Sequence, residues 1–300
     1  MKEYIIGIDL GGTFIKGGVV NGLGEGNHFV KVLTPSSRFP KEVVAAIHAL
    51  IEEILKKASL KKSDVIGVGV ACPGTIDGEK GVVVSASNFR WYDVPLQNML
   101  EIECNLPVKI VNDADAALVA EMNFGVGKNY QNVVMLTLGT GIGSGVYKNG
   151  KLIGGIELGH VVVVPNGRKC ACGRRGCFER YSSASALVED VKYAMKRKNT
   201  RMAMEEKLTG ETVFEYFEQD EVAKEILLRY FQRFVRGLVN CANVFQPQVI
   251  ILGGGICVSL KRFLPELQKR AVEEASFPME ILIAEHQNNA GTLGAAALWL

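Results

Sequence analysis

The chain has 300 residues, of which 48% are apolar and 22% are charged, and its formal net charge is +2. That length suits two domains of moderate size, and the composition is typical of a soluble globular protein. The small net charge gives no electrostatic footprint for nucleic acid, and no apolar run has the length of a membrane span. The chain opens directly on a predicted strand, with no room for a signal peptide, so we expect a cytoplasmic protein with reduced cysteines.

Strands and helices alternate along the first part of the chain, which predicts an α/β fold. Apolar residues at helical spacing mark the helices, and short apolar runs bounded by turn residues mark the strands. The predicted elements are a strand at 4–12, a returning strand at 13–20, a helix at 41–58, buried strands at 65–71 and 108–113, and a helix that Gly125 ends.

The hairpin at 4–20 recurs later in the chain. Residues 133–147 have the same layout of strand, glycine-rich turn and strand. Such a repeat indicates duplicated halves, although two unrelated hairpins that each need glycine at positive φ would look alike. The elements predicted after it are a helix at 221–245, a strand at 249–255, a helix at 259–275, a strand at 280–285 and a closing helix.

Three glycine-rich turns follow predicted strands, at 9–13, 138–145 and 253–255. Without Cβ atoms, such turns present backbone N–H groups to a phosphate at close range. None has the spacing of a P-loop, and a strand follows the second turn where a dinucleotide-binding fold would have a helix. Asp9 ends a buried strand, where a carboxylate is costly unless it meets a cation. We expect Asp9 either near Mg²⁺ or as the cap of its own turn.

Polar residues after two other strands are further candidates for a ligand site. Asn112 and Asp113 stand where a strand ends and a helix begins, which is where open α/β sheets collect ligands. Asp113 is therefore either a base for a substrate hydroxyl or an ordinary helix N-cap, and spacing alone does not decide between them. Asn88 lies beside aromatic residues, a setting that suits a sugar and also suits an ordinary loop.

Four motifs together resemble the ROK family, which groups sugar kinases, open reading frames and repressors within the actin-like ATPase superfamily. They are GIDLGGTFIKGG near the start, VNDADAALVAE at 111–121, ELGH at 157–160 and CACGRRGCFE at 170–179. The last resembles the family's Cys-x-Cys-Gly-x-x-Gly-Cys-x-Glu signature at every fixed position. The resemblance implies an actin-like (ribonuclease H-like) α/β fold of two domains with a ligand cleft between them.

The resemblance also implies a role for each matched residue. The ATP-binding residues would be Asp9, Gly11, Gly12, Thr13, Lys16, Gly139, Thr140, Gly141, Gly253, Gly254 and Gly255. The sugar-binding residues would be Asn88, Asn112, Asp113, Glu157, His160 and Glu179, with Asp113 as the catalytic base. The zinc ligands would be His160, Cys170, Cys172 and Cys177.

The chemistry of the cysteine motif agrees with a zinc site. Three thiolates and an imidazole form a closed tetrahedral set typical of structural zinc. The alternative is a group of reduced, unligated thiols, and a thioredoxin-like redox pair would need Cys-x-x-Cys, which this stretch lacks. We expect this motif in the larger of two domains, at 114–287, and a smaller domain at 1–113 that is joined by the C-terminal helix at about 288–300.

The function expected from the resemblance is ATP- and Mg²⁺-dependent phosphorylation of a hexose 6-hydroxyl, as in a glucokinase. An N-acetylmannosamine or N-acetylglucosamine kinase is the alternative, because the resemblance implies the same zinc signature for both types and one sequence does not separate them. The loop before Glu157 is shorter than is usual in the family, which would favour a bulkier group on the second carbon. A sugar-responsive repressor would need a DNA-binding segment before the first strand, and an actin-like scaffold would not need the sugar and zinc motifs. The family resemblance also implies a homodimer.

Overall fold

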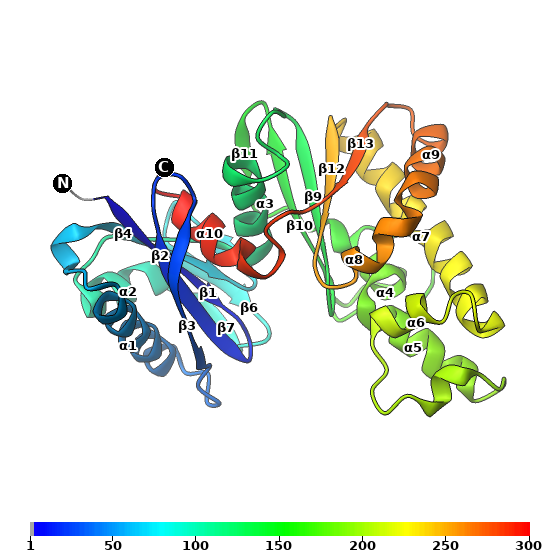
Figure 1. The fold of residues 1–300 in the computed structure, drawn as a ribbon, viewed down its shortest axis with the longest axis horizontal. Helices are drawn as coiled ribbons and strands as arrows, with labels where there is room; N and C mark the ends of the chain where they lie inside the picture. Colours follow the sequence, from blue (N-terminus) through cyan, green and yellow to red (C-terminus); the bar gives the residue numbers. More distant parts are fainter. Residues whose placement is uncertain (1–2) are drawn as a thin grey trace. The chain divides into compact units, whose positions relative to one another are not determined.

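The computed structural model describes residues 3–300 and divides into two compact units (Figure 1). Unit 1 comprises residues 3–129, 152–155 and 288–300, and unit 2 comprises residues 130–151 and 156–287. The division differs from the predicted boundary after Asp113, because helix α3 (Asp113–Phe124) packs against α10 (Ala290–Ala297) within unit 1. Among the described residues, no helix is both long enough and apolar enough to span a bilayer.

The sheet of unit 1 has the strand order β3-β2-β1-β4-β8. Strand β1 is antiparallel to β2 and parallel to β4, and β4 is parallel to β8. The carboxyl ends of these three parallel strands therefore share one edge of the sheet, with Asp9 and Asn112 at the ends of the two outer ones. The strands are β1 (Tyr4–Leu10), β2 (Phe14–Val20), β3 (Gly26–Leu33), β4 (Val65–Cys72) and β8 (Val108–Asn112).

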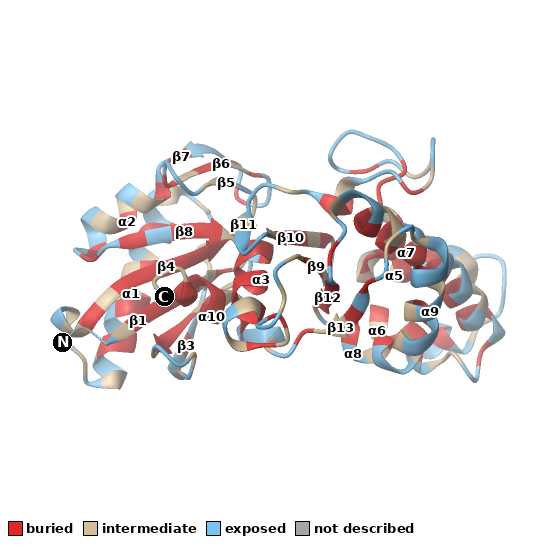
Figure 2. Ribbon diagram, turned by 90° about the horizontal axis from the view of Figure 1, so that it is seen from above, coloured by how far each residue is buried: buried red, intermediate tan, exposed pale blue. Residues whose placement is uncertain are grey.

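Helix α1 (Pro40–Ala58) covers unit 1's sheet with one apolar face. Proline is its first residue, where the missing N–H costs nothing, and Ser59 ends it in the left-handed conformation. Its buried residues pack with the strands into one core, and Figure 2 shows β1 and β4 buried along most of their length. Helix α2 (Leu96–Cys104) packs beside α1, and β5 (Thr75–Asp77), β6 (Val82–Ala86) and β7 (Trp91–Val94) form a small separate sheet.

Unit 2 repeats the sheet of unit 1, with the strand order β11-β10-β9-β12-β13. Its central strand is again antiparallel to the next strand in sequence and parallel to the strand on its other side. The order and directions confirm the predicted repeat. The strands are β9 (Val133–Leu138), β10 (Ile142–Lys148), β11 (Lys151–Ile153), β12 (Val249–Gly253) and β13 (Glu280–Ile283).

The longest helix, α7 (Glu221–Phe245), carries much of unit 2's core on its apolar face. Its start is capped by Asp220, whose carboxylate accepts from two backbone N–H groups. The other helices of unit 2 are α4 (Glu179–Ser182), α5 (Ala184–Met195), α6 (Gly210–Glu215), α8 (Cys257–Leu260) and α9 (Leu264–Glu274).

Some predicted bounds were wrong. The single helix predicted at 259–275 is broken into α8, a 3₁₀ turn and α9, and Pro265 in the first turn of α9 disfavours a continuous helix there. The last two strands end at Gly253 and Ile283, short of their predicted limits. Strand β3 was missed because it is an edge strand with only Val30 fully buried, so it carries little apolar signal.

Candidate functional site

Asp9 lies at the carboxyl end of β1, before the first glycine turn. Lys16 is its cross-strand partner on β2, and the Lys16 ammonium lies 4.0 Å from the Asp9 carboxylate. Burial raises the pKa of Asp9, and the charge of Lys16 lowers it in part. Gly291 at the start of α10 permits close packing, because a Cβ there would lie 2.8 Å from the Asp9 carboxyl carbon. The carboxylate is thus partly buried beside a single lysine, a setting in which a bound cation would stabilise its charged form.

Asn112 caps helix α3, so the cap is not supplied by Asp113, the other candidate for this role. Its side-chain oxygen accepts from the N–H groups of Ala114, at 2.8 Å, and Asp115, at 3.2 Å. Its amide nitrogen donates to the carbonyl oxygen of Gly74 at 2.8 Å. These contacts fix the end of β8, and they occupy much of the hydrogen-bonding capacity of Asn112 that a sugar would need.

Asp113 is exposed in the first turn of α3. One carboxylate oxygen accepts from the Ala114 N–H at 2.9 Å. The carboxylate lies at the positive end of the helix dipole, which attracts negative charge. Asp113 also contributes, after burial, to the raised pKa of the Cys72 thiol on the neighbouring strand.

Asn88 is exposed in the loop between β6 and β7. The loop is anchored by Phe89 and Trp91, which are 3% exposed each and whose ring centroids lie 4.8 Å apart. The backbone oxygen of Asn88 accepts from the guanidinium of Arg38. The aromatic residues next to Asn88 therefore act as its anchor within the fold.

The second glycine turn, at 139–141, is held from both sides. The Ala184 N–H at the start of α5 donates to the Gly139 oxygen at 2.9 Å. The Glu179 carboxylate accepts from the Ile142 N–H at 3.0 Å. A Cβ at position 141 would lie 2.2 Å from this carboxylate, so glycine lets the Glu179 side chain keep this position. Glu179 therefore holds the turn through this hydrogen bond. Its contact with a sugar stays a prediction.

A cavity of about 530 Å³ lies within unit 2 beside Thr140. Of the residues predicted to bind ATP, Thr140 alone lines it. Glu211 lines it too and also reaches the third glycine turn, since a Cβ at Gly255 would lie 3.0 Å from its carboxylate. The remaining lining residues are Ala184, Ser185, Val188, Glu189, Lys192, Thr209 and Gly210. The lining residues on α5 follow helical spacing. An ordinary amphipathic helix has the same pattern, so the sequence alone did not identify them as part of a cavity.

Glu157 is exposed in a loop that Ser144 of β10 holds in place. The buried Ser144 hydroxyl donates to the Ile156 oxygen at 2.7 Å and accepts from the Leu158 N–H at 2.8 Å. The two bonds bracket Glu157 and fix the backbone on either side of it. Sequence reasoning missed Ser144 because a serine inside a glycine-rich strand gives no signal of its own.

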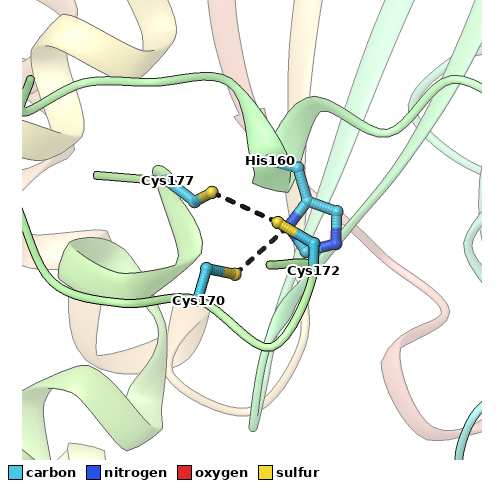
Figure 3. Close-up of side chains that lie close together, drawn as sticks. All are labelled: His160, Cys170, Cys172 and Cys177. Carbon is cyan, nitrogen blue, oxygen red and sulfur yellow. Dashed lines mark hydrogen bonds between the residues drawn. The ribbon is translucent and has the colours of Figure 1, made fainter. Parts of the chain in front are cut away.

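His160, Cys170, Cys172 and Cys177 form one cluster, whose ligand atoms all lie within 4.8 Å of one another (Figure 3). His160 Nδ1 is 3.7 Å from the Cys170 sulfur, and the sulfurs of Cys172 and Cys177 are 3.6 Å apart. That separation is far too long for a disulfide, and all three thiols are free. A tetrahedral zinc with Zn–S bonds near 2.3 Å needs ligand atoms roughly 3.8 Å apart, so the donor set fits the metal.

The charge of the thiolates is partly offset within the same loop. The Arg174 backbone N–H is the main cause that lowers the pKa of Cys172, to about 6, and the Arg174 side chain adds to it. Burial raises the pKa of Cys177 to about 12. The loop closes on itself through the Cys170 N–H, which donates to the Arg174 oxygen at 2.9 Å. This bond and the cluster geometry place the thiols of the loop close to His160.

Comparison with known proteins covers almost the whole chain. The sequence model of the ROK family matches residues 5–300. The glucokinase of Thermotoga maritima is 33% identical over 313 residues, which span 99% of this chain and 97% of that protein. The crystal structure of a ROK family glucokinase from Streptomyces griseus, in complex with glucose and AMPPNP, has a TM-score of 0.83 at 30% identity and covers 98% of both chains. The xylose repressor of Bacillus subtilis is 29% identical, over 98% of this chain and 76% of the repressor.

Proposed function

The chain belongs to the ROK family, and on that premise we propose that it is an ATP- and Mg²⁺-dependent kinase that phosphorylates the 6-hydroxyl of a hexose, with glucose as the first candidate. The proposal rests mainly on two neighbouring residues at the start of α3. Asn112 caps the helix, and Asp113 next to it is exposed at the positive end of the helix dipole. That is the position that a base for a sugar hydroxyl would occupy.

The chemical step follows from this position. The Asp113 carboxylate would accept the proton of the attacking hydroxyl as the γ-phosphoryl group is transferred. The bond from phosphorus to the leaving ADP oxygen breaks while the bond to the sugar oxygen forms. Most of the rate enhancement in such reactions comes from positioning and from neutralising charge. Asp113 is therefore one component beside the groups that hold the phosphates.

The phosphates would be bound by backbone N–H groups of the turns at 11–13 and 139–141 and by Lys16. Mg²⁺, when bound with ATP, neutralises negative charge on the phosphate oxygens. The partly buried Asp9 would hold this ion directly or through its water ligands. The adenosine would occupy the 530 Å³ cavity of unit 2, where Glu211 connects the cavity to the third glycine turn.

Zinc would have a structural role here. The four donors form a closed set with no ligand position left for a substrate. The metal would fix the loop from His160 to Cys177, and with it the backbone that continues from Glu157. We also propose a cytoplasmic location, because the thiols must stay reduced to bind the metal, and a homodimer, which rests on family membership alone.

The proposal is tested by coupled ADP release across a panel of sugars. We expect turnover with glucose that requires both ATP and Mg²⁺, and we expect no ADP release in the absence of sugar. Nuclear magnetic resonance of the product should show the phosphate on the 6-oxygen. A protein that is folded by circular dichroism and turns over no hexose would rule out a kinase.

The same panel decides between two substrates. Only the short segment 149–156 separates the β10 strand from Glu157, and we infer that such a short loop would favour a bulkier group on the second carbon of the sugar. A higher kcat/KM for N-acetylmannosamine or N-acetylglucosamine than for glucose would make the protein an N-acetylhexosamine kinase. Retention on DNA without sugar turnover would instead indicate a regulator related to the xylose repressors.

A further inference from the structure

All three carbonyl oxygens of the first glycine turn are engaged by a single loop, residues 34–38. The Thr34 hydroxyl donates to the Gly11 oxygen at 2.7 Å, and the Thr34 N–H donates to the Thr13 oxygen at 3.0 Å. The Arg38 guanidinium donates to the Gly12 oxygen at 3.2 Å. The contacts join positions more than twenty residues apart, so they are a tertiary feature of unit 1.

These carbonyl contacts set the direction of two N–H groups. In a trans peptide, the C=O and the following N–H lie in one plane and point in opposite directions. Holding the Gly11 oxygen therefore orients the Gly12 N–H, and holding the Gly12 oxygen orients the Thr13 N–H. Within residues 3–300, neither N–H donates to another protein group, and both residues are exposed. The loop thus leaves two neighbouring N–H groups available as donors, as an anion-binding turn requires.

Arg38 also connects this turn to the Asn88 loop. Its guanidinium donates to the Asn88 backbone oxygen and lies 5.5 Å from the centre of the Phe89 ring. Its own backbone oxygen accepts from the indole N–H of Trp91 at 2.7 Å. Arg38 has a φ of 55°, a left-handed conformation that is strained for a residue with a side chain. Tertiary contacts on both sides of the residue hold it in that conformation.

We propose that Thr34 and Arg38 are positioning residues for phosphoryl transfer. Thr34 holds the first turn in its anion-binding form, and Arg38 holds both that turn and the loop of Asn88. Arg38 thereby sets the phosphate-binding turn in register with the sugar-binding loop. The role depends on the planar fork of arginine, because a lysine ammonium cannot reach two carbonyl oxygens in the same fixed geometry. This inference rests on the proposed kinase function.

The first experiment separates binding of phosphate from binding of nucleoside. Calorimetry measures the Kd of ATP and of adenosine for the wild type, Thr34→Val and Arg38→Lys. Loss of one hydrogen bond that orients a donor should weaken ATP roughly fivefold to tenfold. Adenosine has no phosphate to meet the turn, so its Kd should not change. Thr34→Ser keeps the hydroxyl and should restore ATP affinity, and Ser36→Ala at an exposed position in the same loop is the matched control.

The second experiment tests the coupling through Arg38. In steady-state kinetics, Thr34→Val should raise KM for ATP alone, whereas Arg38→Lys should raise KM for ATP and for the sugar. Equal losses of ATP and adenosine binding, unchanged ATP binding in both variants, or an Arg38→Lys effect confined to ATP would each overturn the assignment. Wild-type protein that binds ATP but phosphorylates no sugar would remove the proposed function, and the calorimetric comparison would still decide the role of the loop.

Discussion

At the scale of single residues, Asn112 and Asp113 are neighbours with different roles, because Asn112 caps a helix and Asp113 is the proposed base. Asn112 satisfies two N–H groups at the start of α3 and ties the helix to Gly74. With the cap supplied by its neighbour, the Asp113 carboxylate is placed by the helix and the sheet together. Its geometry is thus determined by backbone elements, which hold a catalytic group more firmly than a mobile loop would.

Asp113→Asn tests the catalytic role directly. Asparagine has nearly the same shape and keeps an oxygen for the Ala114 N–H, so folding and sugar binding should persist. It cannot take up the proton, and kcat should fall by about two to four orders of magnitude. Steady-state kinetics together with sugar calorimetry would check this. A variant with kcat close to that of the wild type would exclude Asp113 as the base.

Asp9→Asn tests whether the carboxylate is kept for a cation at a cost in stability. Burial raises the pKa of Asp9 above its ordinary value of 3.8. The carboxyl group therefore favours the folded state below that ordinary pKa, and the benefit is lost as pH rises through the folded pKa. Without nucleotide or Mg²⁺, the free energy of unfolding of the wild type, measured relative to that of Asp9→Asn, should fall as pH rises through this window. At neutral pH this difference should stay below its value at low pH.

Denaturant titrations at several pH values, from about pH 4 to 8, measure this difference. Addition of ATP and Mg²⁺ should stabilise the wild type more than the variant, because the ion interacts with the charge. A stability difference that does not vary with pH would mean that Asp9 does not titrate on unfolding as its burial predicts.

At the scale of elements, the two hairpin turns are related by the repeat but are held by different neighbours. The first is held by the loop at 34–38, and the second by Glu179 and the start of α5. Helix α5 also lines the 530 Å³ cavity, so one helix shapes both the second turn and the proposed nucleoside site. The loop at 160–177, which carries the proposed zinc ligands, lies between Glu157 and Glu179 in the chain and is closed by its own backbone hydrogen bonds.

Metal removal is the prediction at this scale. Treatment with a strong zinc chelator should raise KM for sugar before it weakens the binding of ATP. The reason is that the metal would hold His160 and, through the 3₁₀ turn that ends there, Glu157. Metal content by mass spectrometry and separate titrations of sugar and ATP would check it. If sugar affinity survives complete metal removal, the metal stabilises the fold alone.

At the scale of the whole molecule, each unit has its own sheet and its own buried core. All four proposed zinc ligands lie in unit 2, and both tryptophans of the chain, Trp91 and Trp299, lie in unit 1. Trp91 is 3% exposed, so its fluorescence reports whether unit 1 is folded. The two units can therefore be followed separately in one sample.

We expect chelation to lower the thermal midpoint of unit 2 more than that of unit 1. Ellipticity at a helical wavelength, which reports both units, should show an early loss after chelation that tryptophan fluorescence does not show. The long helices of unit 2, α5 and α7, give this signal its amplitude. Identical shifts by both probes would mean that the units unfold as one cooperative block.

The sequence by itself determined the features that depend on local spacing. Periodicity located α1 and α7, and glycines after strands located the three turns, because their physical signal is contained in a few neighbouring residues. The resemblance of the cysteine motif to the ROK signature predicted that His160 and the three cysteines lie together, and they form one cluster. The repeat could also be read, since the same hairpin motif appears twice.

The tertiary structure decided which residues hold those features in place. It placed α3 in unit 1, assigned the cap to Asn112, and brought Thr34, Arg38, Ser144 and Glu179 onto the backbone of other elements. It also showed that one face of α5 lines a cavity. Such contacts join residues that are far apart in the chain, and a threonine or arginine in a loop has the same local pattern whether or not it binds a distant carbonyl. Only the folded chain distinguishes the two, because the hydrogen bond depends on where the sheet brings the partner.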